Sequence, residues 1–122
     1  MKKTVKTFGL ATLAGISIAL GCTIFLSLEN RVMGAMLFTV GLFTICTMGF
    51  NLFTGKVCYS NGSLSSILEL IVIWLGNVFG TWLAAALLHL TRHSANLTER
   101  AVSVCQAKLD DSMLSIFILG LF

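Results

Sequence analysis

Three long stretches without a charged side chain constrain this chain more than any other feature. They cover residues 7–28, 32–55 and 70–91. Each is longer than the ~20 residues that an α-helix needs to cross the hydrocarbon core of a bilayer. Charged residues make up only 11% of the chain, about half of what a soluble domain usually has. The sequence therefore predicts an all-α integral membrane protein with three spanning helices.

A fourth apolar stretch covers residues 112–122, where the sequence stops. At ~1.5 Å per residue it reaches about half-way across a bilayer. A helix ending there would leave its last carbonyls and its carboxylate in hydrocarbon, which is costly. We therefore expect the beginning of a fourth helix in a truncated chain. The alternative is a short re-entrant or interfacial segment.

Small residues recur at four-residue spacing in the first and third apolar stretches. They are Ala11, Gly15 and Ala19 in the first, and Gly76, Gly80 and Ala84 in the third. Such a stripe lets two helix backbones approach closely in lipid. Chance is the alternative, since glycine and alanine are common in membrane helices. Two stripes in three helices favour a tightly packed multi-helix bundle.

The second apolar stretch ends in Gly49-Phe50-Asn51-Leu52-Phe53-Thr54-Gly55. Asn51 and Thr54 can hydrogen-bond locally and compete with the helical ladder. Asn51 is also a good N-cap for a helix that restarts after a break. Backbone that leaves the helix at membrane depth is tolerated where it is buried in protein or lines a water-filled path. Transporters place their sites at such breaks, so this segment points to solute passage.

We expect one membrane domain over residues 1–122. Its elements are helix one at about 7–28, a broken helix two at about 33–56, helix three at about 64–91, a loop at 92–111 and a partial helix four at 112–122. Lys2, Lys3 and Lys6 precede the first span, and positive charge favours the cytoplasmic side. The prediction is a multi-pass protein of the plasma or inner membrane with a cytoplasmic N-terminus.

Other classes of function find little support in the sequence. The net charge of +3 requires no nucleic-acid partner. The four cysteines show no CxxC or Cys/His spacing, so we expect no metal and no cofactor. No Ser/His/Asp or phosphate-loop constellation points to an enzyme.

The segment 49–55 resembles the Gly-x-(Asp/Glu)-Leu-Phe-Thr-(Gly/Ser) motif of the formate/nitrite transporter family. Residues 74–80, Trp-Leu-Gly-Asn-Val-Phe-Gly, are similar to its Asn-Trp-x-x-Asn-x-x-Gly stretch. Residues 13–21 match its first helix, and Lys108 with Gly120 matches a lysine and glycine of its fourth. The order and spacing of these four matches agree with the family pattern, and the resemblance covers essentially the whole chain. We expect the matched residues Gly15, Gly76, Asn77 and Gly80 to pack the helices.

The resemblance implies a particular fold. Family members have six membrane helices, built as two inverted three-helix repeats with a broken second helix, and assemble as pentamers with one pore per protomer. This chain would be the first half of that channel fold: helices one to three and the start of helix four. The central pore histidine belongs to the second repeat. We therefore expect a fragment of 122 residues to conduct nothing alone.

The resemblance also assigns pore residues. Leu52, Phe53 and Thr54 match the loop that breaks helix two, where the threonine hydroxyl faces the central histidine and the leucine narrows the pore. Phe38 matches an aromatic residue at a hydrophobic constriction, and Leu42 lies one turn further on.

Supporting roles follow from the same resemblance. Asn51, with Gly49 and Gly55, would support the loop, although the family usually has an acidic residue in place of Asn51. Lys108 matches a lysine at the pore vestibule, where a cation raises the local concentration of small anions. A bare anion is costly in an apolar pore, and protonation removes most of that cost. The partners would be protons and a small weak-acid anion such as formate, nitrite or hydrosulfide, in a lipid bilayer.

Two alternatives remain open at this point. One is a complete small transporter of about four helices that dimerises and uses Glu69 as a proton-coupled acid. The other is a membrane protein that assists assembly and transports nothing.

Overall fold

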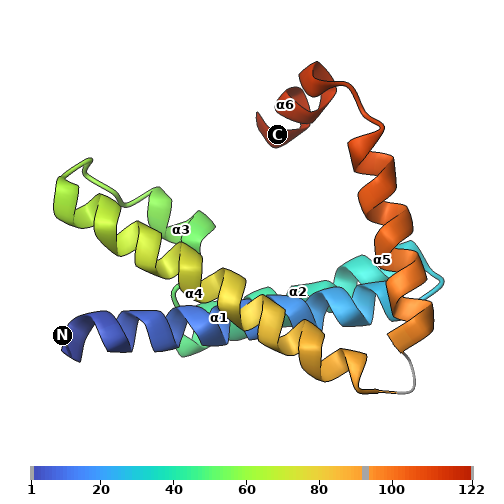
Figure 1. Cartoon of the computed structure of the whole chain (residues 1–122), viewed down its shortest axis with the longest axis horizontal. Coiled ribbons are helices and arrows are strands. Elements are labelled where there is room, and N and C mark those ends of the chain that lie inside the picture. The colour runs from blue at the N-terminus through green and yellow to red at the C-terminus, as the bar shows by residue number, and fades with distance from the viewer. Residues whose placement is uncertain (1, 92–93, 122) are drawn as a thin grey trace.

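The structure is a computed structural model that describes residues 2–91 and 94–121. The described part is helical throughout, apart from short connections (Figure 1). The elements are α1 (Lys2–Ser27), α2 (Arg31–Met48), α3 (Phe53–Val57), α4 (Leu64–His89), α5 (Ser94–Leu109) and α6 (Met113–Leu121). Three of them are long and apolar enough to cross a membrane: Lys3–Ser27, Arg31–Met48 and Leu64–His89. The predicted all-α membrane fold with three spans is confirmed.

Side chains in the connections fix where the helices begin. The Oδ1 atom of Asn30 accepts hydrogen bonds from the backbone N–H groups of Val32 and Met33, at 3.0 and 3.2 Å. The hydroxyl of Ser63 accepts one from the N–H of Ser66 at 3.3 Å. Both residues satisfy donors that the first turn of a helix leaves without a partner, so α2 and α4 have defined starts.

Helix α1 lies between α2 and α4 and packs on both (Figure 1). Ala11 and Ala14 are fully buried. A Cβ atom added at Gly76 would lie 2.6 Å from the Cβ of Ala11, and one at Gly80 would overlap the Thr12 carbonyl. The small-residue stripes therefore lie where the backbones of α1 and α4 come closest, and bulkier side chains there would force the helices apart.

The prediction of a loop at 92–111 is wrong, because residues Ser94–Leu109 form α5. Residues 92–93 lie outside the described part. The segment contains no glycine or proline, and most of its residues are compatible with a helix. Polarity alone therefore does not distinguish a loop from a solvent-exposed helix here. Figure 1 shows α5 running across the end of α1, and α6 following it at an angle to both.

Candidate functional site

Helix α2 ends at Gly49, which divides the second apolar stretch. Gly49 has φ 67° and ψ 33°, the left-handed conformation, and its N–H bonds to the carbonyl of Ile45. The next N–H, that of Phe50, bonds to the same carbonyl at 3.0 Å. A side chain at this φ would be strained, so glycine is the residue suited to this helix end. The chain leaves the helix for four residues, 49–52, and restarts as α3.

The side-chain amide of Asn77 joins the break to two helices. Its Nδ2 donates to the carbonyl of Ala11 at 2.8 Å and to the carbonyl of Asn51 at 2.9 Å. Its Oδ1 accepts from the N–H of Phe53 at 2.9 Å. Asn77 lies on α4, Ala11 on α1, and Phe53 is the first residue of α3. One side chain thus bonds to three separate segments.

Asn51 is held in a different way from the one we predicted. We expected its side chain to cap the restarted helix, but Leu52 occupies the N-cap position of α3 and makes no side-chain capping bond. The Asn51 Nδ2 instead donates to the Thr7 carbonyl at 3.4 Å, and its N–H to the Leu10 carbonyl at 3.3 Å. Asn77 supplies the acceptor for the first N–H of α3. Asn51 therefore attaches the break to α1.

The three residues that match the pore loop surround the start of α3. Leu52 and Phe53 are half-buried, and Thr54 is exposed. Helix α3 lies against α4. Gly55, predicted to support the loop, lies inside α3 with open space around it. Of these two loop glycines, Gly49 is the one whose conformation calls for glycine.

The hydroxyl of Thr54 differs from most threonine hydroxyls in these helices. Several threonines donate to the carbonyl four residues earlier; they are Thr12, Thr23, Thr44, Thr47 and Thr81. For Thr54 the residue four positions earlier is Phe50, which lies outside the helix. Within the described part of the chain, the Thr54 hydroxyl has no hydrogen-bond partner. The break therefore leaves a hydroxyl available to a solute or to another side chain.

The other predicted pore residues lie further along the bundle. Phe38, on α2, is half-buried against Gly21 of α1, and Leu42 is 43% exposed. Phe38 is about 16 Å before Gly49 along α2, taking the helical rise of ~1.5 Å per residue. The structure therefore separates Phe38 from the break and does not bring the two into one cluster.

Lys108 lies in the last turn of α5, the helix that follows the third span. Phe38 packs beside Gly21 of α1 and Asn77 binds at Ala11, so the aromatic residue and the break are about 15 Å apart along α1.

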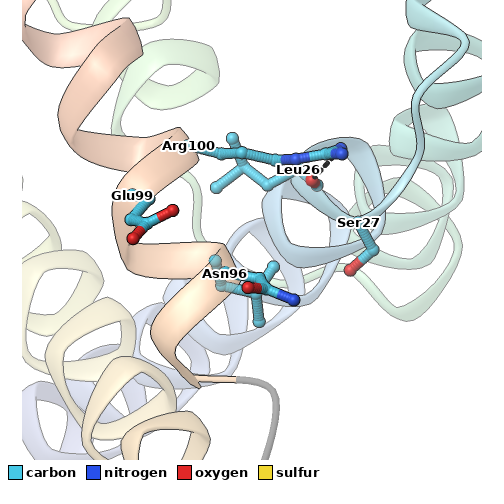
Figure 2. Close-up of a pocket in the computed structure, with 6 residues that line it drawn as sticks. Leu26, Ser27, Asn96, Glu99 and Arg100 are labelled. Carbon is cyan, nitrogen blue, oxygen red and sulfur yellow. Dashed lines mark hydrogen bonds between the residues drawn. The ribbon is translucent and has the colours of Figure 1, made fainter.

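Helix α5 is attached to α1 by Arg100, a residue that the sequence did not single out. Its guanidinium donates to the carbonyls of Leu26 and Leu28, at 3.0 and 3.1 Å. Figure 2 shows the side chain reaching from α5 to the last turn of α1, beside an open pocket of about 410 Å³. These carbonyls are among those that a helix end leaves unpaired, so Arg100 caps α1 from outside.

Glu69, the acid of the alternative transporter, lies in the first half of α4 and pairs with Lys3 at 3.6 Å. Both side chains are partly exposed, 45% for Glu69 and 85% for Lys3. Among the residues that the structure describes, no group of three or more His, Cys, Asp or Glu could hold a metal ion.

Comparison with known proteins adds one finding. The family model for Formate/nitrite transporter matches residues 1–122, which include the break, Asn77 and α5. Neither the curated proteins nor the solved structures give a match.

Proposed function

This chain belongs to the formate/nitrite transporter family, and we propose that the break between α2 and α3 forms part of its anion pore. Membership confirms the resemblance inferred from the four motifs. It also implies transport of small anions across a membrane, in a family of transporters and not of enzymes. The roles of single residues, the assembly and the substrates belong to the proposal.

The observation that supports the pore assignment best is the open hydroxyl of Thr54 at an interrupted membrane helix. A helix break in a membrane requires partners for its backbone, and the Asn77 amide and the Leu10 carbonyl supply them here. The Thr54 hydroxyl, which has no hydrogen-bond partner among the described residues, can then bond to the solute or to a proton-donating side chain. Leu52 and Phe53 beside it form an apolar constriction.

The pathway begins at Lys108 and proceeds by changes in polarity. Lys108 concentrates a small anion at the mouth. Phe38 and Leu42 then oppose entry of the bare anion, because an apolar surface cannot replace its water. Protonation of the anion to its neutral acid lowers this barrier. The substrates are small weak acids of the formate, nitrite or hydrosulfide type.

The proposal includes the setting of the protein. It is a multi-pass protein of the plasma or inner membrane, with the lysine-rich N-terminus in the cytoplasm. The complete transporter is a homopentamer in which Gly49, Asn51 and Gly55 belong to the pore loop. Gly15, Gly76, Asn77 and Gly80 pack the protomer.

Replacing the Thr54 hydroxyl tests this function directly. The protein expressed from its complete gene is reconstituted in liposomes, and formate uptake is followed by the internal pH. We expect Thr54→Val to slow uptake by about tenfold or more, since a group that assists proton transfer contributes at least that much. Leu52→Ala should change the rate by widening the constriction. Thr47→Val, on α2, removes a hydroxyl that bonds within its own helix and is the control. Equal rates in all four proteins would place the pore elsewhere.

A further inference from the structure

We propose that Asn77 is a positioning residue that sets the width of the constriction, and hence which weak acids pass. The proposal rests on the proposed function and extends it to a residue of α4 that need not touch the solute. Three observations support it: the bonding of the amide, the weakness of the other attachments of the break, and the rigidity of the helix that holds Asn77.

The bonding of the amide leaves one orientation for the side chain. The Nδ2 atom donates to two carbonyl oxygens, of Ala11 and Asn51, and the Oδ1 atom accepts from the Phe53 N–H. A flipped amide would turn its oxygen toward two carbonyls. An amide is the side-chain group that offers donors and an acceptor together at this size. Asn77 therefore bonds both to the break, at the carbonyl of Asn51, and to the first residue of α3, at the N–H of Phe53.

The other attachments of the break are weaker. The two bonds from Asn51 to α1 are 3.3 and 3.4 Å long, near the limit for a hydrogen bond. Helix α3 has only five residues, and a helix of that length is not stable by itself. The position of Leu52 and Phe53 thus depends mainly on the Asn77 amide.

The helix that bears Asn77 is fixed against α1. Gly76 and Gly80 flank it, and both meet the α1 backbone without room for a Cβ atom. On the opposite side, a Cβ at Gly15 would overlap the Asn77 carbonyl. The position of the break relative to α1 and α4 therefore depends on the bonds that Asn77 makes to it. A change at Asn77 alters where the constriction lies, while the α1–α4 contact itself stays in place.

Asn77→Asp is the most direct test, because it keeps the size of the side chain and replaces both donors with an acceptor. The complete protein is studied in two ways: hydrogen exchange of residues 50–57 and the ratio of formate to lactate flux in liposomes. We expect exchange at the break to rise about tenfold, as for the loss of a buried hydrogen bond. The flux ratio should fall severalfold, because the larger acid gains from a looser constriction. This ratio does not depend on how many molecules are active.

The control is Thr81→Val, one turn further along the same contact. The Thr81 hydroxyl bonds to the carbonyl of Asn77 at 2.9 Å and lies 3.4 Å from that of Gly15, so the variant loses a polar atom without altering the break. Asn77→Ser, too short for all three bonds, is measured in parallel in case the aspartate variant does not assemble. It should shift the ratio in the same direction.

The outcomes separate the two proposals. Unchanged exchange at 50–57, or an unchanged flux ratio in the variants, would overturn the role of Asn77. Formate flux through the unsubstituted protein would in that case still support the transport function. Absence of flux through the unsubstituted protein would instead refute the proposed function and, with it, the effect of Asn77 on selectivity.

Discussion

At the scale of single residues, glycine serves two distinct purposes in this chain. Gly49 is required for its left-handed φ of 67° and has no atom within 4 Å of an added Cβ. Gly15, Gly76 and Gly80 have ordinary helical conformations and are required for space. The first kind fixes where a helix ends, and the second kind fixes how closely two helices lie. Replacing glycine therefore has a different physical cost at the two kinds of position: backbone strain at Gly49, and steric overlap at Gly15, Gly76 and Gly80.

Gly49→Ala isolates the conformational cost. We expect the variant to lose about 1 kcal/mol of stability, because alanine is strained in the left-handed region. Gly9→Ala is the matched control: Gly9 also has open space around it, but lies inside α1. That change should be neutral or stabilise by up to about 1 kcal/mol, since alanine favours a helix. Thermal unfolding in detergent measures both. Shifts of the same sign would contradict the assigned conformation of Gly49.

The same scale shows how far the sequence allowed the site to be predicted. The pattern at 49–55 indicated a break, and the structure has one there. The partner of the break was not predictable from spacing, because Asn77 is 26 residues from Asn51 and 66 from Ala11. Asn51 looked like an N-cap from its neighbours alone, yet its side chain bonds to Thr7. Local rules describe what a residue can do, and only the packing of distant helices decides which bond forms.

At the scale of elements, charge-free stretches were enough to predict the spans, but not α5. The spans need only length and apolarity, and both can be read from the sequence. Helix α5 is too polar overall to be recognised as a span, although Leu97, Ala101, Val104 and Cys105 recur at helical spacing along it. What holds it is a long-range bond: Arg100 reaches the carbonyls of Leu26 and Leu28. The position of Lys108 depends on that attachment.

Arg100→Gln should release α5 from α1. The variant loses two charge-assisted bonds, and the α1 carbonyls return to water or headgroups. Since these groups are exposed, we expect a modest effect, an increase of about fivefold in hydrogen exchange over 94–109. Exchange in α4 should not change. Glu99→Gln removes a charge from the same turn of α5 and serves as the control. Equal exchange in both variants would show that α5 is held by other contacts.

At the scale of the whole molecule, apolar and polar groups lie at different points along α1. The ring of Phe38 lies beside Gly21, and the broken helix lies near Ala11. In the proposed pathway, a cation at the mouth attracts the anion, and the apolar constriction admits the neutral acid. A pore of this kind benefits from concentrating anions even though the bare anion does not cross. In that proposal Lys108 acts through long-range electrostatics, which salt weakens.

Lys108→Gln therefore should slow formate uptake at low ionic strength and have little effect at high. We expect a reduction of about threefold at 10 mM salt, where the screening length is about 30 Å, and near-equal rates at 1 M, where it is about 3 Å. Lys108→Arg retains the charge and should behave like the unsubstituted protein. Lys56→Gln, in the last turn of α3, controls for the loss of a positive charge elsewhere. A reduction that is the same at both salt concentrations would mean that Lys108 acts by contact and not through its field. If Lys56→Gln had the larger effect, the mouth of the pore would lie at the α3 end of the molecule, because the field of a cation is strongest beside it.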